Sequence, residues 1–274
     1  MRNTRAFNIS AYTVLSVLVI LQMIPMLLLV MISFKSQPQV LTAPLIPTFP
    51  VHWDNYGRAW LLGVRNYLVN SLFLTVTVLV GNMVFSSITA YVFARHDFPG
   101  KDVLFALILG LMVIPGITTL IPRYILIRDL GLLNKYWGVI LPGILGANAF
   151  NIYILRTFFE SLPEELFESA RLDGAGHLII FSRLVVPLSW AIISSLSILS
   201  VLGTWNAYLW PLLVLGRDSL RTVAVGIVYL ADARTPELGV QMAANVIASI
   251  PLLVLFLAAM RTFVQGLSEG AIKM

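Results

Sequence analysis

The stretch Tyr67–Ala94, YLVNSLFLTVTVLVGNMVFSSITAYVFA, contains no charged side chain. A helix that crosses the hydrocarbon core of a bilayer needs about 20 mostly apolar residues, because it rises about 1.5 Å per residue. The stretch is long enough to do so. It therefore predicts a transmembrane helix and sets the class of the chain around it.

Five further apolar stretches pass the same test, at approximate bounds Ile9–Ser33, Val103–Pro122, Tyr136–Leu155, Leu184–Tyr208 and Leu238–Met260. The first is too long for the roughly 7–15-residue core of a cleavable signal peptide, so we interpret it as a retained helix. The 274 residues are 58% hydrophobic and only 11% charged, whereas soluble domains carry about a quarter charged residues. We expect an all-α polytopic membrane protein with about six transmembrane helices.

The charge pattern excludes a nucleic-acid-binding role and gives only a weak signal for topology. The net charge of +5 comes from basic residues scattered among loops, with no dense run. With the amino terminus in the cytoplasm, the 18 Lys and Arg divide equally between the two sides. The inside segments are shorter, so their higher density of basic residues favours cytoplasmic termini. The chain has no cysteine, which excludes disulfides, a thiol nucleophile and a Cys-ligated zinc site.

Three polar segments are expected on the outer face. Lys35–Asn66 is rich in proline and aromatic residues and predicts an extended stretch followed by a short interfacial helix at Asn55–Leu62. Arg123–Lys135 and Pro211–Pro236 are too polar to span the membrane, so we expect both to be solvated.

The polar stretch Thr157–Arg183 predicts two short helices. Ser161 followed by Glu164 fits a capping box, Pro163 suits the first helical turn, and Glu164 and Glu165 complement the positive end of the helix dipole. Gly174 should end the first helix in the left-handed conformation, after which the chain restarts at Gly176 and runs to Pro187.

Within this stretch the chain reads Glu168-Ser169-Ala170-Arg171-Leu172-Asp173-Gly174, then nine residues, then Leu184-Val185-Val186-Pro187. The spacing resembles the cytoplasmic loop of ABC importer permeases, which reads Glu-Ala-Ala, three residues, Gly, nine residues, Ile-x-Leu-Pro. Ser169 departs from the first alanine, and Leu184 and Val186 are apolar substitutes. A permease without its own motor needs a rigid projecting element that receives force from a separate ATPase, and a short capped helix suits that task.

Other segments extend the resemblance over most of the chain. The residues Asn70-Ser71-Leu72, Trp205–Leu212 and Gly266–Lys273 look like the carbohydrate-uptake branch of these permeases, and most closely like its maltose-type second permease subunit.

The resemblance implies a division of the chain and a set of partners. It implies an amino-terminal helix with an outer segment at 1–66, a permease core at 67–265 that includes the coupling loop 157–183, and a cytoplasmic tail at 266–274. It also implies two ATPase subunits, a second permease forming a heterodimer, an extracytoplasmic solute-binding protein and a carbohydrate substrate, with membrane lipid around the spans. The residues expected to couple to the ATPase are Glu168, Ser169, Ala170, Asp173, Gly174 and Pro187.

The motifs of a nucleotide-binding ATPase and of a zinc protease are missing from the sequence. There is no G-x-x-x-x-G-K-[ST] phosphate loop and no H-E-x-x-H. The three histidines, His52, His96 and His177, lie in separate loops. We therefore expect no enzyme activity, no metal site and no cofactor, with ATP hydrolysed by another chain.

Polar residues inside the spans recur at helical spacing and mark a candidate substrate path. The candidates are Asn82, Ser86, Asn148, Asn151, Ser194, Gln241, Asn245 and Ser249. Amides and hydroxyls suit sugar hydroxyls, but they serve equally well in helix-to-helix hydrogen bonds. No charged side chain falls near the middle of an expected span, which argues against an ion-coupled pathway and favours an uncharged substrate.

Two other classes of transporter remain open. A secondary transporter or channel would work without an ATPase, but the inverted repeats that would support it are not evident. An ABC permease for amino acids or peptides would share the coupling loop without the carboxyl-terminal pattern.

Overall fold

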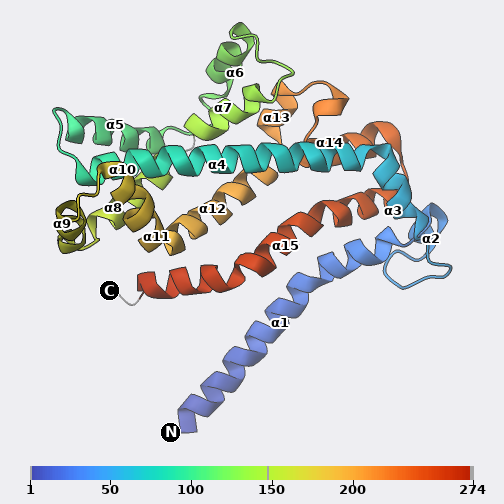
Figure 1. Ribbon diagram of the computed structural model, residues 1–274. Helices are drawn as coiled ribbons and strands as arrows, with labels where there is room; N and C mark the ends of the chain where they lie inside the picture. Colours follow the sequence, from blue (N-terminus) through green and yellow to red (C-terminus); the bar gives the residue numbers. More distant parts are fainter. Residues whose placement is uncertain (1, 147, 272–274) are drawn as a thin grey trace. The chain divides into compact units, whose positions relative to one another are not determined.

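The computed structural model describes residues 2–146 and 148–271, with side-chain surroundings for residues 11–146 and 148–258. Every regular element in these ranges is a helix (Figure 1), which confirms the expected all-α class. The chain divides into two compact units. Unit 1 comprises Met1–Arg65 and Gly226–Pro251, and unit 2 comprises Asn66–Val225 and Leu252–Met274.

Unit 1 opens with α1 (Arg2–Ser33), α2 (Gln37–Thr42), α3 (Asp54–Ala59) and the π-helical turn η1 (Trp60–Val64). Its later part holds the end of α14 (Val223–Tyr229), the π-helical turn η4 (Leu230–Arg234) and the first part of α15 (Leu238–Ala271). The short helix expected at Asn55–Leu62 is present as α3 and η1. Helix α2 was not expected, and Pro38 fits within it because it lies in the first turn, where a missing N–H costs little.

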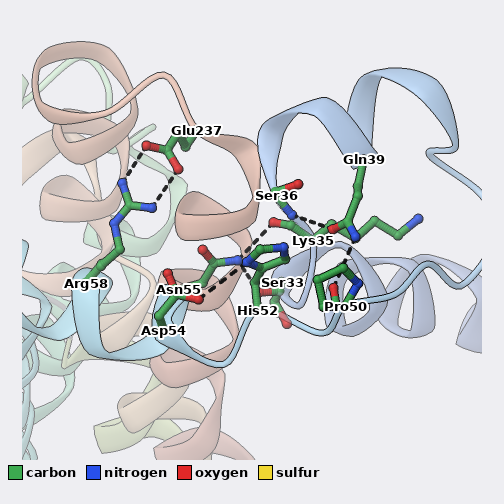
Figure 2. Close-up of polar contacts among 10 residues, drawn as sticks. All are labelled: Ser33, Lys35, Ser36, Gln39, Pro50, His52, Asp54, Asn55, Arg58 and Glu237. Atoms are coloured by element: carbon green, nitrogen blue, oxygen red, sulfur yellow. Dashed lines mark hydrogen bonds and ion pairs between the residues drawn. The ribbon is translucent and has the colours of Figure 1, made fainter.

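A polar network in unit 1 ties the end of α1 to α3 (Figure 2). The Asn55 side-chain amide donates to the carbonyls of Ser33 and Lys35, both at 2.9 Å. The Lys35 ammonium is 2% exposed and donates to three carbonyls at 2.6, 3.1 and 2.7 Å. They belong to Ala43, Pro44 and Ile46. Burial lowers the pKa of Lys35, and these carbonyls supply one acceptor for each ammonium proton. The proline-rich segment thus folds over a buried cation.

Unit 2 is organised along α4 (Arg65–Arg95), one of the long helices in Figure 1. A helical break at Gly63, where φ is 122°, separates α4 from the short helix before it. The rest of the unit comprises α5 (Lys101–Val113), α6 (Leu120–Asp129), α7 (Trp137–Leu145), α8 (Ala149–Glu160), α9 (Glu164–Leu172), α10 (His177–Ile180), η2 (Phe181–Val185), α11 (Val186–Leu188), α12 (Trp190–Trp205), α13 (Leu209–Val214) and the 3₁₀ turn η3 (Asp218–Leu220).

Two hydrophobic clusters hold these helices on α4. One joins the amino-terminal half of α4 to α6, α7 and α13, through residues such as Leu74, Ile127 and Val214. The other joins the carboxyl-terminal half to α8, α9 and α12, and includes the fully buried Phe159 and Phe167. Each cluster therefore supports a different end of α4.

In the described part of the chain, four helices are long and apolar enough to cross a membrane: Ala11–Ser33, Asp54–Arg95, Trp137–Glu160 and Leu238–Ala258. A fifth span results if His177–Leu188 and Trp190–Trp205, which meet at 78°, count as one. The expected span Val103–Pro122 is not a single helix, because α5 ends at Val113 and Ile114 turns to an extended conformation before Pro115. The residue before a proline disfavours the helical region, which explains the break.

Candidate functional site

A cavity of about 440 Å³ lies within unit 2, walled by α4, α7, α12 and α13 with contributions from α6 and α8. Its volume is in the range of small-molecule sites, about 300–1,000 Å³. Seven polar side chains from the α4, α8, α12 and α14 region line it with neutral groups: Ser71, Thr75, Asn82, Asn151, Ser200, Thr204 and Thr222. The rest of the lining is largely apolar, so the cavity offers a ligand a few separate polar contacts on an apolar surface.

Two buried amides form a fixed pair in the cavity wall. The Asn151 side-chain amide donates to Asn82 Oδ1 at 2.7 Å, and Asn82 Nδ2 donates to the Gly143 carbonyl at 3.2 Å. Asn82 is 2% exposed and Asn151 8%. The structure thus brings together these two candidate substrate-path residues from α4 and α8, and the pairing fixes the orientation of both amides.

The close approach of α4 and α7 beside this pair depends on glycine. A Cβ at Gly143 would lie 2.9 Å from Val78 Cγ1, well inside ordinary contact. Small residues allow membrane helices to pack backbone against side chain. Gly143 therefore sets the separation of the two helices that carry the cavity wall.

The other candidate substrate-path residues lie outside this cavity. Ser86 is fully buried and its hydroxyl has no hydrogen-bond partner among the described residues. Asn148 lines a second cavity of about 460 Å³, walled mainly by apolar residues of α4, α5 and α8, and its amide donates to the Ile144 carbonyl. Ser194 is half-buried on α12.

The last three candidates belong to unit 1, on α15. Gln241 donates to the Thr235 carbonyl at 2.8 Å, and Asn245 donates to the Gln241 carbonyl at 2.9 Å. Ser249 donates to the Val246 carbonyl at 2.7 Å. These bonds stay within α15 and the turn before it, so they hold the local backbone.

Several cavity residues escaped the sequence reasoning, among them Thr222 and the charged Arg123. Arg123 was expected in a solvated outer segment, but it lies on α6 and lines the cavity. Its guanidinium carbon is 3.8 Å from the centre of the Trp210 ring. The expectation that Arg123–Lys135 is wholly solvated is therefore wrong at its first residue. The available signal was its position directly after Pro122, at the end of an apolar run.

The Asn70-Ser71 pair at the start of α4 has a structural task. Asn70 Nδ2 donates to the carbonyls of Ser219 and Arg221 at 2.8 and 2.9 Å, and the Ser71 hydroxyl accepts the Val223 N–H at 2.7 Å. These bonds fix the segment that carries Thr222 into the cavity wall. Asn70 and Ser71 thereby stabilise one edge of the cavity.

Helix α9 begins differently from the expected capping box. Pro163 is the N-cap, with no side-chain cap, and Ser161 is the C-cap of α8, where its hydroxyl donates to the Phe158 carbonyl at 2.7 Å. The predicted capping box at Ser161 is therefore wrong. Helix α8 runs through Glu160, so Ser161 ends that helix and does not start α9. Glu164 and Glu165 do occupy the first turn of α9, where they complement the helix dipole.

Helix α9 ends as the sequence predicts. Gly174 has φ of +80°, the Ala175 N–H donates to the Ala170 carbonyl at 2.9 Å, and the Gly174 N–H donates to the Arg171 carbonyl at 3.0 Å. This pair of bonds is a Schellman motif. Helical structure then restarts at His177 and continues through Leu188, so the loop has a defined turn between two helical segments.

Arg95, the last residue of α4, clamps this loop. Its guanidinium bonds Glu164 Oε2 at 2.6 Å and the carbonyls of Phe159 and Leu162 at 2.6 and 2.7 Å. It also stacks at 3.8 Å on the ring of the buried Phe167. No sequence motif marked Arg95, yet it joins α4, α8 and α9 at one point.

The remaining candidate coupling residues lie mainly on the open side of the loop. Glu168, Ser169, Asp173 and Pro187 are exposed, while Ala170 packs partly against the cluster around Phe159. Two large apolar side chains also project here, Leu172 at 89% and Leu178 at 83% exposure. Exposed apolar residues on either side of a rigid turn are typical of a protein-protein contact.

The cavity, the long α4 helix and the capped loop at its end define a membrane transport subunit. Residues 82–269 match the family described as "Binding-protein-dependent transport system inner membrane component". The chain belongs to this family, and it is a permease of the ABC importer type.

Relatives and a solved structure agree with this assignment. The chain is 33% identical to the sn-glycerol-3-phosphate transport system permease protein UgpE of Yersinia pestis, over 98% of both chains. It is 28% identical to the diacetylchitobiose uptake system permease protein NgcG of Streptomyces coelicolor, over 98% of this chain and 90% of that one. A bacterial ABC transporter that imports the acidic polysaccharide alginate contains a chain matching at a TM-score of 0.84 and 25% identity, over 96% of this chain and 98% of that one.

The carboxyl-terminal pattern Gly266–Lys273 cannot be placed in the same way. The structure describes the backbone only as far as Ala271, and the side chains of this pattern lie outside the described residues.

Proposed function

We propose that this chain carries a carbohydrate across the cytoplasmic membrane, using ATP hydrolysed by partner subunits. The observation that carries the proposal is the continuity of α4. Ser71 and Asn82 line the cavity, and Arg95 on the same unbroken helix clamps the capped loop. From Ser71 to Arg95 the helix spans about 36 Å at 1.5 Å per residue, so force applied to the loop reaches the cavity through a rigid element.

The exposed face of the loop supports an ATPase as the partner that docks there. Leu172 and Leu178 supply apolar anchors, and Glu168 supplies a carboxylate for a basic group. Asp173 and Gly174 form the short turn between these two leucines, and Ser169 is a small exposed residue on α9. The full importer then comprises two ATPase subunits, a second permease and an extracytoplasmic binding protein.

The lining of the cavity supports a sugar as the substrate. Fixed amides and hydroxyls beside apolar walls match the hydroxyl groups and the apolar faces of a pyranose. The relatives are named for diacetylchitobiose, an oligosaccharide, and for sn-glycerol-3-phosphate, a polyol phosphate. These names therefore support a sugar or a related polyol as the substrate class, and they leave the charge of the substrate open.

Membrane orientation is part of the proposal, with both termini and residues 157–183 in the cytoplasm and Lys35–Asn66 outside. The chain has no cysteine of its own, so single introduced cysteines report the side directly. A Ser169→Cys variant should resist an impermeant thiol reagent in intact cells and react after lysis. A Leu45→Cys variant, at a side chain that is 69% exposed, should react in intact cells, and the reverse pattern would overturn the orientation.

Affinity purification of the tagged chain from its native membrane tests the partnership. An ATPase and a second permease should elute with it in stable proportion. A Glu168→Lys variant should insert normally but retain less ATPase, since a repulsive charge replaces an attractive one. Elution of the wild-type chain with neither partner would reject the proposal.

A further inference from the structure

Arg123 is the one charged residue among the described residues that line the 440 Å³ cavity. Every other polar group in that lining is an uncharged amide, hydroxyl or indole. A lone cation in an otherwise neutral cavity gives the whole cavity a positive potential. The sequence led us to expect a pathway without charged side chains and an uncharged substrate. Arg123 places a charge in this cavity.

The Arg123 guanidinium is held in place by an aromatic ring rather than by a counter-ion. It stacks at 3.8 Å on Trp210, and the Trp210 indole N–H in turn donates to the Gly138 carbonyl at 3.2 Å. The indole is therefore fixed by its own hydrogen bond. Stacking leaves the edges of the guanidinium plane, which carry the N–H donors, directed away from the ring.

No carboxylate in the described part of the chain pairs with Arg123. The acidic residues nearest in sequence to the cavity elements have other partners: Asp129 bonds Arg128 at 2.9 Å, and Asp218 bonds Arg221 at 2.8 Å. Arg123 Nε is buried and has no hydrogen-bond partner among the described residues. A desolvated donor without an acceptor is costly, so an acceptor brought by a ligand would complete the site.

We propose that Arg123 is a specificity-determining residue that binds an anionic group, carboxylate or phosphate, of a sugar substrate in this cavity. A guanidinium binds either group through two parallel N–H donors. The Asn82 and Asn151 amides then face the neutral hydroxyls of the same ligand. That the ligand is a sugar rests on the proposed function, whereas the requirement for an anion rests on Arg123 itself.

The test compares the binding of three sugars to the detergent-solubilised chain at equal ionic strength. D-glucose, D-glucuronate and D-glucose 6-phosphate share one pyranose ring and differ only in the group at carbon 6. Binding is measured by thermal shift and by calorimetry. One or both anions should bind at least about tenfold more tightly than D-glucose, and Arg123→Gln should remove that preference. The two anion arms show whether carboxylate or phosphate is the preferred group.

Control variants separate a site from general attraction to a basic protein. Arg128→Gln, on the exposed face of the same helix, should leave anion binding unchanged. Arg123→Lys should retain the charge preference with weaker binding, and it serves as the second variant should Arg123→Gln fail to fold. Equal binding of glucose and both anions, or an equal loss in Arg128→Gln, overturns the proposal.

The same titration on the complex that purifies with the tagged chain adds one further outcome. Anion binding by the chain alone but not by the complex would mean that another subunit supplies the counter-ion, which also overturns the proposal. Absence of an ATPase from the eluate would reject the proposed function while leaving the anion result on the chain intact. The two failures are therefore distinguishable.

Discussion

At the scale of single residues, Gly174 carries the strongest local constraint in the loop. Its φ of +80° lies in the left-handed region, and the space around an added Cβ is open. The penalty for another residue is therefore conformational, about 1–2 kcal/mol and more for a β-branched side chain.

Gly174→Val should insert normally but lower the population of the correct loop by about 5–30-fold or more, and ATP-driven uptake should fall accordingly. Uptake and ATPase co-purification are measured together. Gly176→Val is the matched control, because Gly176 has φ of −74° and open space around it. Equal behaviour of the two variants would contradict the role given to the turn.

The Arg58–Glu237 pair in unit 1 makes a prediction about pH (Figure 2). The two nitrogens of Arg58 bond the two carboxylate oxygens at 2.7 and 2.5 Å. Hydrogen bonding from Arg58 holds the pKa of Glu237 below its ordinary value of 4.5. Because the folded-state pKa is the lower one, the stabilisation is complete above the unfolded value and is lost as the pH falls through the folded value.

The pair is partly exposed, so its contribution should be about 1 kcal/mol or less. Glu237→Gln should lower the melting temperature at pH 7 and flatten its decline in acid, measured by scanning fluorimetry in detergent. Glu165→Gln, at an exposed carboxylate with no ion pair among the described residues, should keep the wild-type profile. Identical acid profiles for wild type and Glu237→Gln would refute the assignment.

At the scale of elements, the contact of α4 with α7 depends on one absent methyl group. Gly143→Ala should place a Cβ at 2.9 Å from Val78 Cγ1 and destabilise the protein by about 1–3 kcal/mol through overpacking. Val78→Ala should relieve it, so the double variant should be more stable than the two single changes predict by addition. Gly110→Ala, with open space around it, is the control. If the stability changes of the two single variants simply add in the double variant, the contact between Gly143 and Val78 does not limit how closely α4 and α7 pack.

The clamp at the end of α4 makes a separate prediction. Arg95→Lys keeps the charge but cannot bond Glu164 and two carbonyls at once while stacking on Phe167. The ATPase should still co-purify, while sugar uptake per ATP hydrolysed should fall several-fold. Arg171→Lys, which loses one exposed bond to Glu164 at 3.3 Å, should have little effect. An unchanged uptake ratio in Arg95→Lys would mean that the clamp does not transmit force.

These elements also show which parts of the fold can be predicted from the sequence. Apolar length predicted α1, α4 and the start of α15, and glycine chemistry predicted the end of α9, because both effects are local. The break after Val113 was missed because the apolar run continues past it, although Pro115 marks the break locally. The hydrogen bond of Ser161 to the end of α8 was missed because it depends on where that helix stops.

The cavity was predicted only in part, for a different reason. Helical spacing put Asn82 on the correct face of α4, but spacing cannot show which stripe meets another helix. Arg123 belongs to a short helix that tertiary packing brings to the cavity. From the sequence, the polarity of Arg123 indicated only that the side chain would lie in solvent.

At the scale of the whole molecule, the surface of α1 requires an apolar environment outside the chain. The span Ala11–Ser33 has no buried residue in its most apolar window, and side chains such as Ile20 and Leu27 are more than half exposed. Such a helix is stable only against lipid or another apolar protein surface. This agrees with a subunit that works inside a larger membrane assembly.

Uptake into liposomes tests the central claim most directly. The chain alone and the complex that purifies with it are reconstituted separately and given a radiolabelled sugar that the intact importer transports, with ATP or a non-hydrolysable analogue. We predict uptake only by the complex, only with hydrolysable ATP, and strongly reduced in Gly174→Val. Sugar-specific uptake by the chain alone without ATP would contradict the account.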